Sequence, residues 1–581
     1  MRVSYPRTPH LPWSPGASAD DVRTGGLDGL RGREVVVTEK LDGENTTLYR
    51  DGLHARSLDS GHHPSRAWVK ALQGRIGPAV PAGWRVCGEN LFARHSLAYR
   101  ELDSWFYGFS VWDDTDHCLG WDDTVRFLRR LGVPAPRVLW RGVLDEKALR
   151  ALRLDTEQVE GYVVRTVGGF PRAEFGQRVA KWVRPHHVQT DTHWMHAAVV
   201  ENGLGPSAAL WAVRSGAPAD LPALLGAAGL DPEMAPVAEA AVAEVSARLD
   251  VLGRRGDARL AGVLAAAVPG SNRAGLAAGL AGPLGMPLAR RVADLVGLHP
   301  VLQRPYPDED RRAGLVRLAQ AADLGVLHAL AAAVTAGRAD PDAADAREQS
   351  EWSALHAEDA GLLGEAPLAA LRTGLGAALA DLGPDAADRC WAEAREAFAL
   401  GRVTGVEDAV AAAWRWRSGG FPQLVQLVGP SGSGKSVFAD GLPGAAARIS
   451  LDGLREERGD RGDQRANGDV LRGGLDRLDA ALARGGTVVW DATSLNRQQR
   501  SLVQGIAQRR DALVTQAVLL VGEAELVRRN AVRPHPVPSG VLARQLRRFG
   551  PPYAGEAHRT WYVGEAGAVE DTAGTIGGED A

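Results

Sequence analysis

Lysine is scarce in this chain. Only five of its 67 basic residues are lysines: Lys40, Lys70, Lys147, Lys181 and Lys435. Since arginine serves wherever a positive charge alone suffices, a retained lysine is a candidate for chemistry that arginine cannot perform, such as nucleophilic attack by an amine whose pKa can be adjusted. Drift is the simpler explanation for any one lysine, but three of the five lie inside recognisable motifs.

The chain also has few cysteines, no long apolar run and a small net charge. The three cysteines form no CxxC pair and are too few for a disulfide framework, which indicates a reducing, cytoplasmic compartment. The first residues contain no apolar core of a signal peptide, and no run of 18 apolar residues predicts a membrane span, so we expect no membrane contact. With a net charge of −4, binding of nucleic acid must depend on local basic patches.

The pattern of apolar residues changes along the chain and predicts a multidomain protein. Residues 1–200 hold short strand-like segments bounded by Gly, Asp and Pro, which predict an antiparallel-rich α+β domain. These segments are REVVVTEK (33–40), WRVCGEN (84–90), SWFYGFSVWD (104–113), EGYVVR (160–165) and RVAKWV (178–183).

The remaining residues divide into three further parts. Residues 201–405 contain no lysine and show helical periodicity, as in 234–252 and 387–401, so we expect an all-α middle domain. Residues 406–565 alternate strands and helices and predict an α/β domain with a parallel sheet. Residues 566–581 are small and acidic, and we expect a disordered tail.

A phosphate-binding loop follows the first strand of the α/β part. The sequence GPSGSGKS, which starts at Gly429, fits GxxxxGK[ST] completely between a predicted strand and a predicted helix. Gly432 and Gly434 would let backbone N–H groups approach phosphate oxygens. Lys435 would reach the β- and γ-phosphates, and Ser436 would hold Mg²⁺. The motif predicts binding of ATP or another NTP.

Two further features concern the phosphoryl acceptor. Asp452 and Arg455 lie three residues apart after a likely strand. Asp452 could accept the proton of an acceptor hydroxyl and Arg455 could bind an acceptor phosphate, although a capped helix start would explain the same pair. Asp491 ends the predicted strand VVWD, at the place of a carboxylate directed to Mg²⁺ in P-loop enzymes.

Three segments of this region, LDGLR (451–455), WDATSLNRQQR (490–500) and RRNAVRPHPVPSGVLARQLRRF (528–549), together resemble the kinase module of polynucleotide 5′-kinases. The resemblance covers about 150 residues. It implies that Asp452 is the general base and that Arg455 contacts the 3′-phosphate of a 5′-OH acceptor. It also implies that Arg529 or Arg533 is a lid arginine on the transferring phosphoryl group, a role for which Arg528 competes; a solvated basic helix face is the alternative.

The lysine at the end of REVVVTEK belongs to a second motif, Lys40-Leu-Asp42-Gly43. A short KxDG occurs often by chance, but further pieces follow it in order: Arg56-Ser57, CGENL (87–91), WFYGFSVWD (105–113), EGYVVR (160–165) and VAKWV (179–183). As an ordered set over roughly residues 30–200, they resemble the nucleotidyltransferase motifs of ATP-dependent RNA ligases, which implies an ATP-grasp-like α+β domain.

The resemblance gives each residue of the set a role. Lys40 would attack the α-phosphorus of ATP and form lysyl-AMP, with Asp42 and Gly43 beside it in the nucleotide site. Glu89 and Glu160 would contact the ribose and the catalytic Mg²⁺ or Mn²⁺. The alternative for both is an exposed charged residue on a strand, without a role in the site.

The other ligase residues would act on the base and the phosphates. Phe109 would stack on adenine, with a core position as its alternative. Arg56 would bind a phosphate, and Lys181 would neutralise the α-phosphate. The family usually has two lysines here, separated by one residue, whereas Val179 and Val183 flank Lys181 at that spacing. Arg178 and Arg184 are the neighbouring replacements.

The segment after this set bears on the substrate. It leads into Ala-rich helices rather than a second β-domain, which favours an RNA ligase over a DNA ligase. His186, His187, Asp191, His193 and His196 suggest a metal site, but hydrogen bonding at a domain edge or contacts with RNA phosphates are favoured. The middle domain has no DxDx[TV] motif and no His-Asp pair of a metal phosphohydrolase, so we predict no phosphatase there.

Together these features predict a bifunctional enzyme of RNA repair. Its substrates would be RNA with 5′-OH or 5′-phosphate and 3′-OH ends, and a separate 3′-phosphatase is a candidate partner. Three alternatives stay open: a ligase and kinase for nicked duplexes or DNA, a 5′-kinase with an inactive ligase-like nucleotide-binding module, and a small-molecule kinase. The attached ligase argues against the last, because a ligase needs the 5′-phosphate that a polynucleotide kinase supplies.

Overall fold

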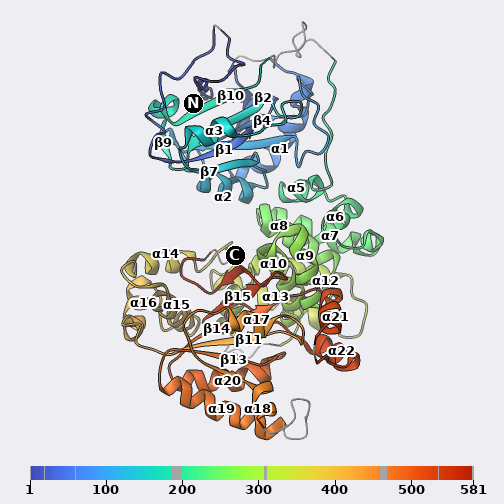
Figure 1. The fold of residues 1–581 in the computed structure, drawn as a ribbon. Helices are drawn as coiled ribbons and strands as arrows, with labels where there is room; N and C mark the ends of the chain where they lie inside the picture. The colour runs from blue at the N-terminus through green and yellow to red at the C-terminus, as the bar shows by residue number, and fades with distance from the viewer. Residues whose placement is uncertain are drawn as a thin grey trace. The chain divides into compact units, whose positions relative to one another are not determined.

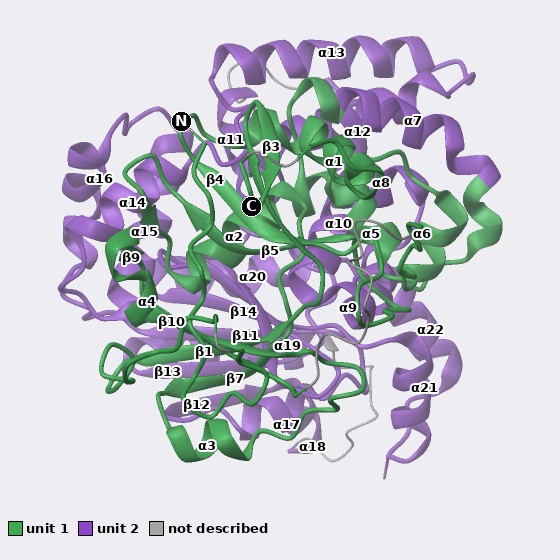
Figure 2. Cartoon of the chain, turned by 90° about the horizontal axis from the view of Figure 1, so that it is seen from above, with its two compact units in different colours: residues 1–235, 249–260 green, residues 236–248, 261–581 purple. Residues whose placement is uncertain are grey.

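A computed structural model describes residues 2–18, 20–58, 61–185, 198–305, 311–457, 467–533 and 535–578 (Figure 1). The chain forms two compact units, residues 1–235 with 249–260 and residues 236–248 with 261–581 (Figure 2). Most of the helical segment 201–405 therefore belongs to the same unit as the P-loop. The histidine-rich stretch 186–197 lies outside the described residues.

Two antiparallel sheets form the first unit. One has the strand order β10-β8-β1-β7 and the other β3-β2-β4-β5-β6-β9. The strands are β1 (Glu34–Lys40), β2 (Glu44–Tyr49), β3 (Gly52–Ala55), β4 (Arg85–Asn90), β5 (Phe106–Trp112), β6 (His117–Cys118), β7 (Val138–Val143), β8 (Gly161–Thr166), β9 (Phe170–Pro171) and β10 (Val179–Val183). The helices are α1 (Ala67–Ile76), α2 (Trp121–Leu131), α3 (Glu146–Ala151), α4 (Phe175–Arg178), α5 (Ala208–Arg214) and α6 (Leu221–Ala227). The prediction of an antiparallel-rich α+β domain is confirmed.

Several apolar clusters hold this unit together. Leu72 of α1 and Leu128 of α2 pack on the larger sheet against residues such as Val86 and Phe106. A second cluster packs α3 against β1, β8 and β10. The third, which includes Cys87, Trp112, Cys118, Phe170 and Phe175, joins strands of both sheets, and the candidate site lies beside it.

Helices dominate the segment between the two sheet-bearing regions. They are α7 (Ala235–Val251), α8 (Gly256–Ala267), α9 (Arg273–Leu284), α10 (Met286–Leu298), α11 (Arg311–Ala319), α12 (Leu324–Ala336), α13 (Ala343–Asp359), α14 (Ala369–Ala378), α15 (Pro384–Ala399) and α16 (Val406–Ala413). The all-α prediction for the middle of the chain is confirmed. Within the described ranges no single helix is long and apolar enough to cross a membrane; the bent pair α11 and α12 meets that criterion only when taken together.

The P-loop region forms a six-stranded sheet with the order β12-β13-β11-β14-β15-β16. Its strands are β11 (Gln423–Val428), β12 (Ala445–Ser450), β13 (Thr487–Asp491), β14 (Leu513–Leu519), β15 (Arg559–Val563) and β16 (Val569–Ala573). Its helices are α17 (Lys435–Asp440), α18 (Leu451–Glu456), α19 (Asn467–Ala483), α20 (Arg497–Arg509), α21 (Glu523–Ala531) and α22 (Ser539–Arg548). The strands from β12 to β15 are parallel, as predicted.

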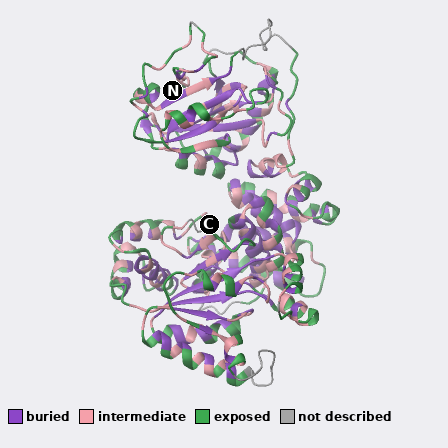
Figure 3. Ribbon diagram, viewed as in Figure 1, coloured by how far each residue is buried: buried purple, intermediate pink, exposed green. Residues whose placement is uncertain are grey.

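The burial of this sheet agrees with its parallel strands. The central strands β11 and β14 are buried along almost their whole length, as Figure 3 shows, and parallel sheets are covered on both faces. Helices α19 and α20 supply Leu478 and Val503 to one core cluster, and α17 supplies Ala439 to another. The carboxyl ends of β11 and β13 thereby meet at the P-loop.

The predicted disordered tail is wrong for its described residues. Strand β16 pairs antiparallel with β15 and ends the sheet. Asp571 forms an ion pair of 2.7 Å with the buried Arg290, and the backbone N–H of Ile576 donates to Asp388 at 2.9 Å. The small, acidic composition resembles that of a disordered segment, and it gives no sign of the contacts with Arg290 and Asp388. Residues 579–581 are outside the described part.

Candidate active sites

Lys40 ends β1, a strand paired with β7 on one side and β8 on the other. Four consecutive buried residues, 35–38, fix this strand in the sheet. The Lys40 Nζ donates to the Oε2 of Glu160 over 2.5 Å, and both side chains are largely buried. Burial alone would lower the pKa of Lys40, but the carboxylates of Glu160 and Glu89 outweigh it and raise that pKa. The lysine is therefore rigidly placed and held as an ammonium.

A cavity opens beside Lys40 and brings together most of the predicted ligase residues. Arg56, Glu89, Phe109 and Lys181 line it together with Lys40 itself. They come from β1, β4, β5, β10 and the segment after β3, so residues up to about 140 positions apart in the sequence share one site. The site combines an amine, a carboxylate, further cations and an aromatic ring, which is a set of groups suited to a nucleotide.

Glu89 has a strongly perturbed environment. Its carboxylate accepts a hydrogen bond from the backbone N–H of Gly43 at 3.2 Å. Burial raises its pKa to about 8; the Lys40 ammonium opposes this rise and the Glu160 carboxylate adds to it. A carboxyl whose charged form is destabilised by burial is stabilised by a bound cation. Glu89 and Glu160 together therefore fit the oxygen ligands that Mg²⁺ or Mn²⁺ prefers.

Asp42 and Gly43 do not line the cavity; they shape the chain around it. The Oδ2 of Asp42 accepts hydrogen bonds from the Ser96 backbone N–H at 2.9 Å, the Ser96 hydroxyl at 2.6 Å and the Leu97 N–H at 2.8 Å. A Cβ on Gly43 would lie 2.5 Å from the carbonyl oxygen of Asn90, so only glycine fits there. Both residues position the turn that follows Lys40.

Aromatic rings form part of the cavity wall. Phe109 is partly exposed to it and meets Tyr5 edge to face, with 5.3 Å between ring centroids. Trp121 and Phe170 also line the cavity. The predicted stacking position of Phe109 is thus beside open space rather than inside the core.

Cations also line the cavity. Burial and the charge of Lys40 lower the pKa of Lys181. Neither predicted replacement for the missing second lysine lines this cavity: Arg178 binds Glu174 and the Gly29 carbonyl, and Arg184 donates to the Thr156 carbonyl.

Two other guanidinium groups take part instead. Arg56 lines the cavity and is close enough to contribute to the lowered pKa of Lys181. Arg165 also lines it and donates to the carbonyls of Phe109 at 3.2 Å and Leu119 at 2.7 Å. Arg165 ends the motif piece EGYVVR but was not predicted as a site residue, because the strand that holds it is otherwise mainly apolar.

The P-loop forms a second candidate site. Gly432 and Gly434 have φ angles of 86° and 96°, which L side chains rarely adopt, and Gly434 precedes the first residue of α17. The Lys435 Nζ donates to the Pro430 carbonyl at 2.7 Å. Burial lowers the pKa of Lys435 to about 8. A bound phosphate would replace the carbonyl as the partner of this amine.

Acidic and basic groups surround Lys435. The Ser436 hydroxyl donates to the Oδ2 of Asp491 at 3.3 Å, so the two residues predicted to hold Mg²⁺ lie together and fit a hydrated divalent cation. Asp491 also accepts a bond of 3.2 Å from the Nε of Arg448. The charges of Asp491, Arg533 and Asp452 all act on Lys435. Arg448 was not predicted as a site residue, because an arginine in a strand belongs to no motif that indicates phosphate or metal binding.

The acceptor and lid residues lie on helices around the loop. Asp452 and Arg455 form an ion pair of 2.6 Å on α18, whose Ser450 N-cap accepts from Gly453. Arg529 forms an ion pair of 2.6 Å with Glu525, and a Cβ on Gly434 would lie 3.9 Å from its Nη1. Arg529 is therefore close to the loop, while Arg533 acts on Lys435 through its charge.

No group of three or more His, Cys, Asp or Glu side chains within the described ranges is arranged to hold a metal ion by itself. The two sites instead offer one or two carboxylates each. That is the usual number for Mg²⁺ in enzymes whose substrates bring phosphate oxygens.

Comparisons with known proteins agree with this division. The RNA ligase family matches residues 33–183 and the AAA domain family matches residues 424–552. No curated protein matches the chain. Among solved structures, a mutant RNA ligase of Naegleria gruberi with AMP and Mn is 18% identical over 27% of this chain and 51% of its own, with a TM-score of 0.21.

Two further structures are similar to parts of the chain. An archaeal ATP-dependent RNA ligase is 16% identical over 31% of this chain and 48% of its own, with a TM-score of 0.23. A gluconokinase of Sinorhizobium meliloti is 26% identical over 26% of this chain and 86% of its own, with a TM-score of 0.20. The chain spans about half the length of these RNA ligases. It therefore contains an RNA ligase domain followed by a AAA-type P-loop domain.

Proposed function

We propose that the chain seals RNA ends with its ligase domain and phosphorylates RNA 5′-OH ends with its P-loop domain. The observation that carries the first activity is one cavity lined by Lys40, Glu89 and Lys181, with Glu160 bonded to Lys40, inside the part that matches the RNA ligase family. The cavity wall holds aromatic rings that suit a base and cations that suit phosphates, so ATP is the nucleotide we assign to it.

The chemistry follows from the positions of the side chains. The Nζ of Lys40 forms a bond to the α-phosphorus of ATP, and the bond from that phosphorus to pyrophosphate breaks. Before the attack the ammonium gives one proton to the Oε2 of Glu160, its hydrogen-bond partner at 2.5 Å, which frees the lone pair of Nζ. A second proton leaves Nζ for water once the bond to phosphorus has formed. Lys181 and Arg56 neutralise the charge that develops on the phosphate oxygens.

The AMP group then passes through two transfers. A 5′-phosphate oxygen of RNA takes it from Lys40, and a 3′-OH displaces AMP to form the phosphodiester. A divalent cation bound by Glu89 and Glu160 would polarise the phosphoryl oxygens. The Naegleria gruberi ligase has been solved with AMP and Mn and with ATP and Mn, which supports ATP and a divalent metal as cofactors.

The second activity uses the P-loop. Lys435 and the loop backbone bind the donor phosphates, and Ser436 and Asp491 hold Mg²⁺. Asp452 accepts the proton of the 5′-OH as that oxygen attacks the γ-phosphorus, and Arg455 binds the acceptor phosphate. The ion pair of Arg455 with Asp452 places the phosphate-binding group 2.6 Å from the general base, on one turn of a helix. The bond to the departing nucleoside diphosphate breaks in the same step.

The test of the ligase site is incubation with α-labelled ATP and Mg²⁺ followed by denaturing electrophoresis. The wild type should retain the label, and Lys40→Arg should lose it. Lys70→Arg is the matched control, because Lys70 is an exposed lysine of α1 that does not line the cavity. If the wild type is free of pre-bound AMP and takes no label, the P-loop enzyme carries an inactive ligase-like module instead.

The test of the second site is transfer from γ-labelled ATP to a panel of acceptors. We expect label on 5′-OH RNA, loss of transfer in Asp452→Asn, and a higher KM for RNA in Arg455→Ala. Label on DNA ends alone, or on a small polyol such as gluconate and not on RNA, would replace the proposed acceptor.

A further inference from the structure

The first residues of the chain pass along the ligase cavity. Residues 3–11, which we call the N-terminal segment, precede the part that matches the RNA ligase family by more than 20 positions. Tyr5, Pro6 and Thr8 of this segment line the cavity. Part of the cavity wall is therefore built from residues that none of the motifs includes.

The segment is held upstream of Tyr5 by two contacts. The hydroxyl of Tyr49 accepts from the Val3 backbone N–H at 2.9 Å and donates to the Val3 carbonyl at 3.2 Å. The next carbonyl, that of Ser4, accepts from the guanidinium of Arg172 at 2.9 Å. The start of the segment is thereby bound to β2 and to the turn after β9.

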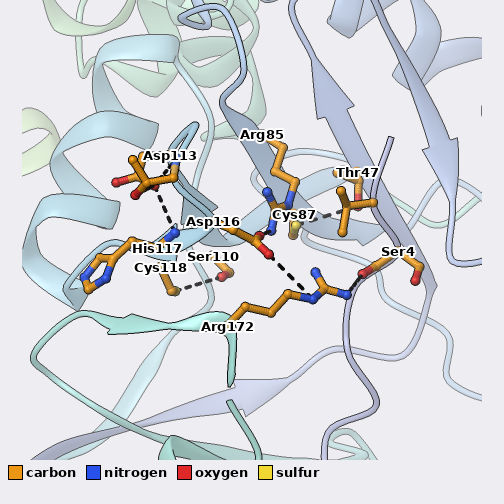
Figure 4. Close-up of polar contacts among 12 residues, drawn as sticks. Ser4, Thr47, Arg85, Cys87, Ser110, Asp113, Asp116, His117, Cys118 and Arg172 are labelled. Atoms are coloured by element: carbon orange, nitrogen blue, oxygen red, sulfur yellow. Dashed lines mark hydrogen bonds and ion pairs between the residues drawn. The ribbon is translucent and has the colours of Figure 1, made fainter. Parts of the chain in front are cut away.

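Arg172 is itself fixed. Asp116 lies 3.8 Å from Arg172 and forms a second ion pair with the buried Arg85, as Figure 4 shows. The guanidinium of Arg85 in turn lies over the ring of Trp112, 4.9 Å from its centre. The Ser4 carbonyl is thus tied through Arg172 and Asp116 to the core of the domain.

Downstream of Tyr5 the segment pairs with β10. The carbonyl of Pro9 accepts from the backbone N–H of Lys181 at 2.9 Å, and the N–H of Leu11 donates to the Lys181 carbonyl at 2.8 Å. Leu11 is fully buried. The four residues between these anchors, Tyr5 to Thr8, are therefore held against the cavity from both ends, and one anchor is the backbone of Lys181, a predicted nucleotide-binding residue.

The ring of Tyr5 packs against other aromatic rings beside the cavity. It meets Phe109 and Phe175 edge to face, at centroid distances of 5.3 Å each and interplanar angles of 71° and 86°. Its side chain also interacts with that of Ser110, another cavity residue. An edge-on neighbour of this kind fixes the plane of Phe109, the ring predicted to stack on the base.

We infer that Tyr5 is a specificity-determining residue of the ligase site: it forms the wall beside the nucleobase and fixes the orientation of Phe109. The inference rests on the proposed self-adenylylation, and it concerns binding of the nucleoside rather than the reaction at phosphorus. Loss of the ring should weaken nucleotide binding and its base preference while leaving the chemical step intact.

The experiment measures the rate of covalent labelling at a series of ATP concentrations. Tyr5→Ala should raise the KM for ATP about tenfold or more, with the rate at saturation within about twofold of wild type, because uniform binding affects KM alone. The preference for α-labelled ATP over α-labelled GTP should also fall. Tyr5→Phe keeps the ring and should stay close to wild type.

Leu11→Ala is the matched control. It removes a fully buried side chain from the same segment but does not line the cavity. It should lower thermal stability without changing the KM. An equal rise in KM for Leu11→Ala would assign Tyr5 a merely structural role, and an unchanged KM in Tyr5→Ala would also overturn the inference.

Absence of label in the wild type would contradict the proposed function and not this inference. The comparison would then be made on ATP binding by the full chain carrying Lys435→Met, which disables the P-loop site. If Tyr5→Ala leaves the dissociation constant for ATP unchanged, the inference is overturned. If Tyr5→Ala raises that constant and Leu11→Ala does not, the inference is supported.

Discussion

Gly161 offers a sharp test of how the sheet positions the catalytic residues. It opens β8 directly after Glu160, and it is paired with Lys40 of β1 on one side and Val183 of β10 on the other. A Cβ at this position would lie 2.0 Å from the carbonyl oxygen of Trp182. Ordinary contacts of a Cβ begin near 3.4 Å, so Gly161→Ala must push β8 and β10 apart by about 1 Å or more.

The displacement acts on both stability and catalysis. Overpacking of this kind costs about 1 to 3 kcal/mol, which lowers the melting temperature of a domain of this size by about 2 to 4 °C per kcal/mol. Because Glu160 and Lys181 flank the displaced backbone, a shift of about 1 Å should also reduce the rate of labelling at saturating ATP about a hundredfold.

The assay combines calorimetry with the initial rate of covalent labelling by α-labelled ATP. Gly176→Ala is the matched control, because Gly176 is a helical glycine of the same unit with no atom within 4 Å of a Cβ. It should retain both properties. A Gly161→Ala protein with wild-type melting temperature and labelling rate would refute the tight β8–β10 pairing on which the site geometry depends.

Other predictions concern charges. The pKa of Glu89 is raised to about 8, so its contribution to the free energy of unfolding is fully present below pH 4.5 and is lost as the pH rises through 8. Denaturant titrations of the metal-free wild type should therefore show a loss of at least about 1.4 kcal/mol across that window, relative to Glu89→Gln. A difference independent of pH would contradict this. The buried pair of Arg66 and Glu44 has a 2.7 Å bond, so Arg66→Met should cost about 3 to 5 kcal/mol and adding Glu44→Gln should recover part of it, whereas additive losses would rule out coupling. Arg448→Ala removes a cation from Asp491 and should lower the Mg²⁺ concentration for half-maximal phosphoryl transfer about two- to fivefold; an increase would show that Arg448 supports metal binding.

The sequence alone was informative where a local pattern decides the structure. The apolar runs before Lys40 and Gly429 form the strands β1 and β11 that were expected, because burial on both faces requires such runs. The glycines of the P-loop have the positive φ angles that the motif needs. The ordered motifs also brought Lys40, Glu89 and Lys181 to one cavity.

What the sequence did not show depends on contacts between distant residues. Tyr5 lines the cavity only because β10 pairs with the N-terminal segment, and no periodicity in that segment records the pairing. Asp42 lies inside the most recognisable motif, yet its carboxylate bonds to Ser96 and Leu97. Likewise β16 is held by its pairing with β15 and by the ion pair of Asp571 with Arg290, about 280 positions earlier. Such roles follow from tertiary structure rather than from residue type.

The most direct test of the account is joining of two RNA strands that meet at 5′-OH and 3′-OH ends, with ATP and Mg²⁺, resolved by denaturing electrophoresis. The account predicts that the wild type joins them, that Lys435→Met joins them only when the 5′ end already carries phosphate, and that Lys40→Arg phosphorylates the 5′ end without joining. Joining of 5′-OH ends by Lys435→Met, or of any ends by Lys40→Arg, would contradict the assignment of the two activities to these two sites.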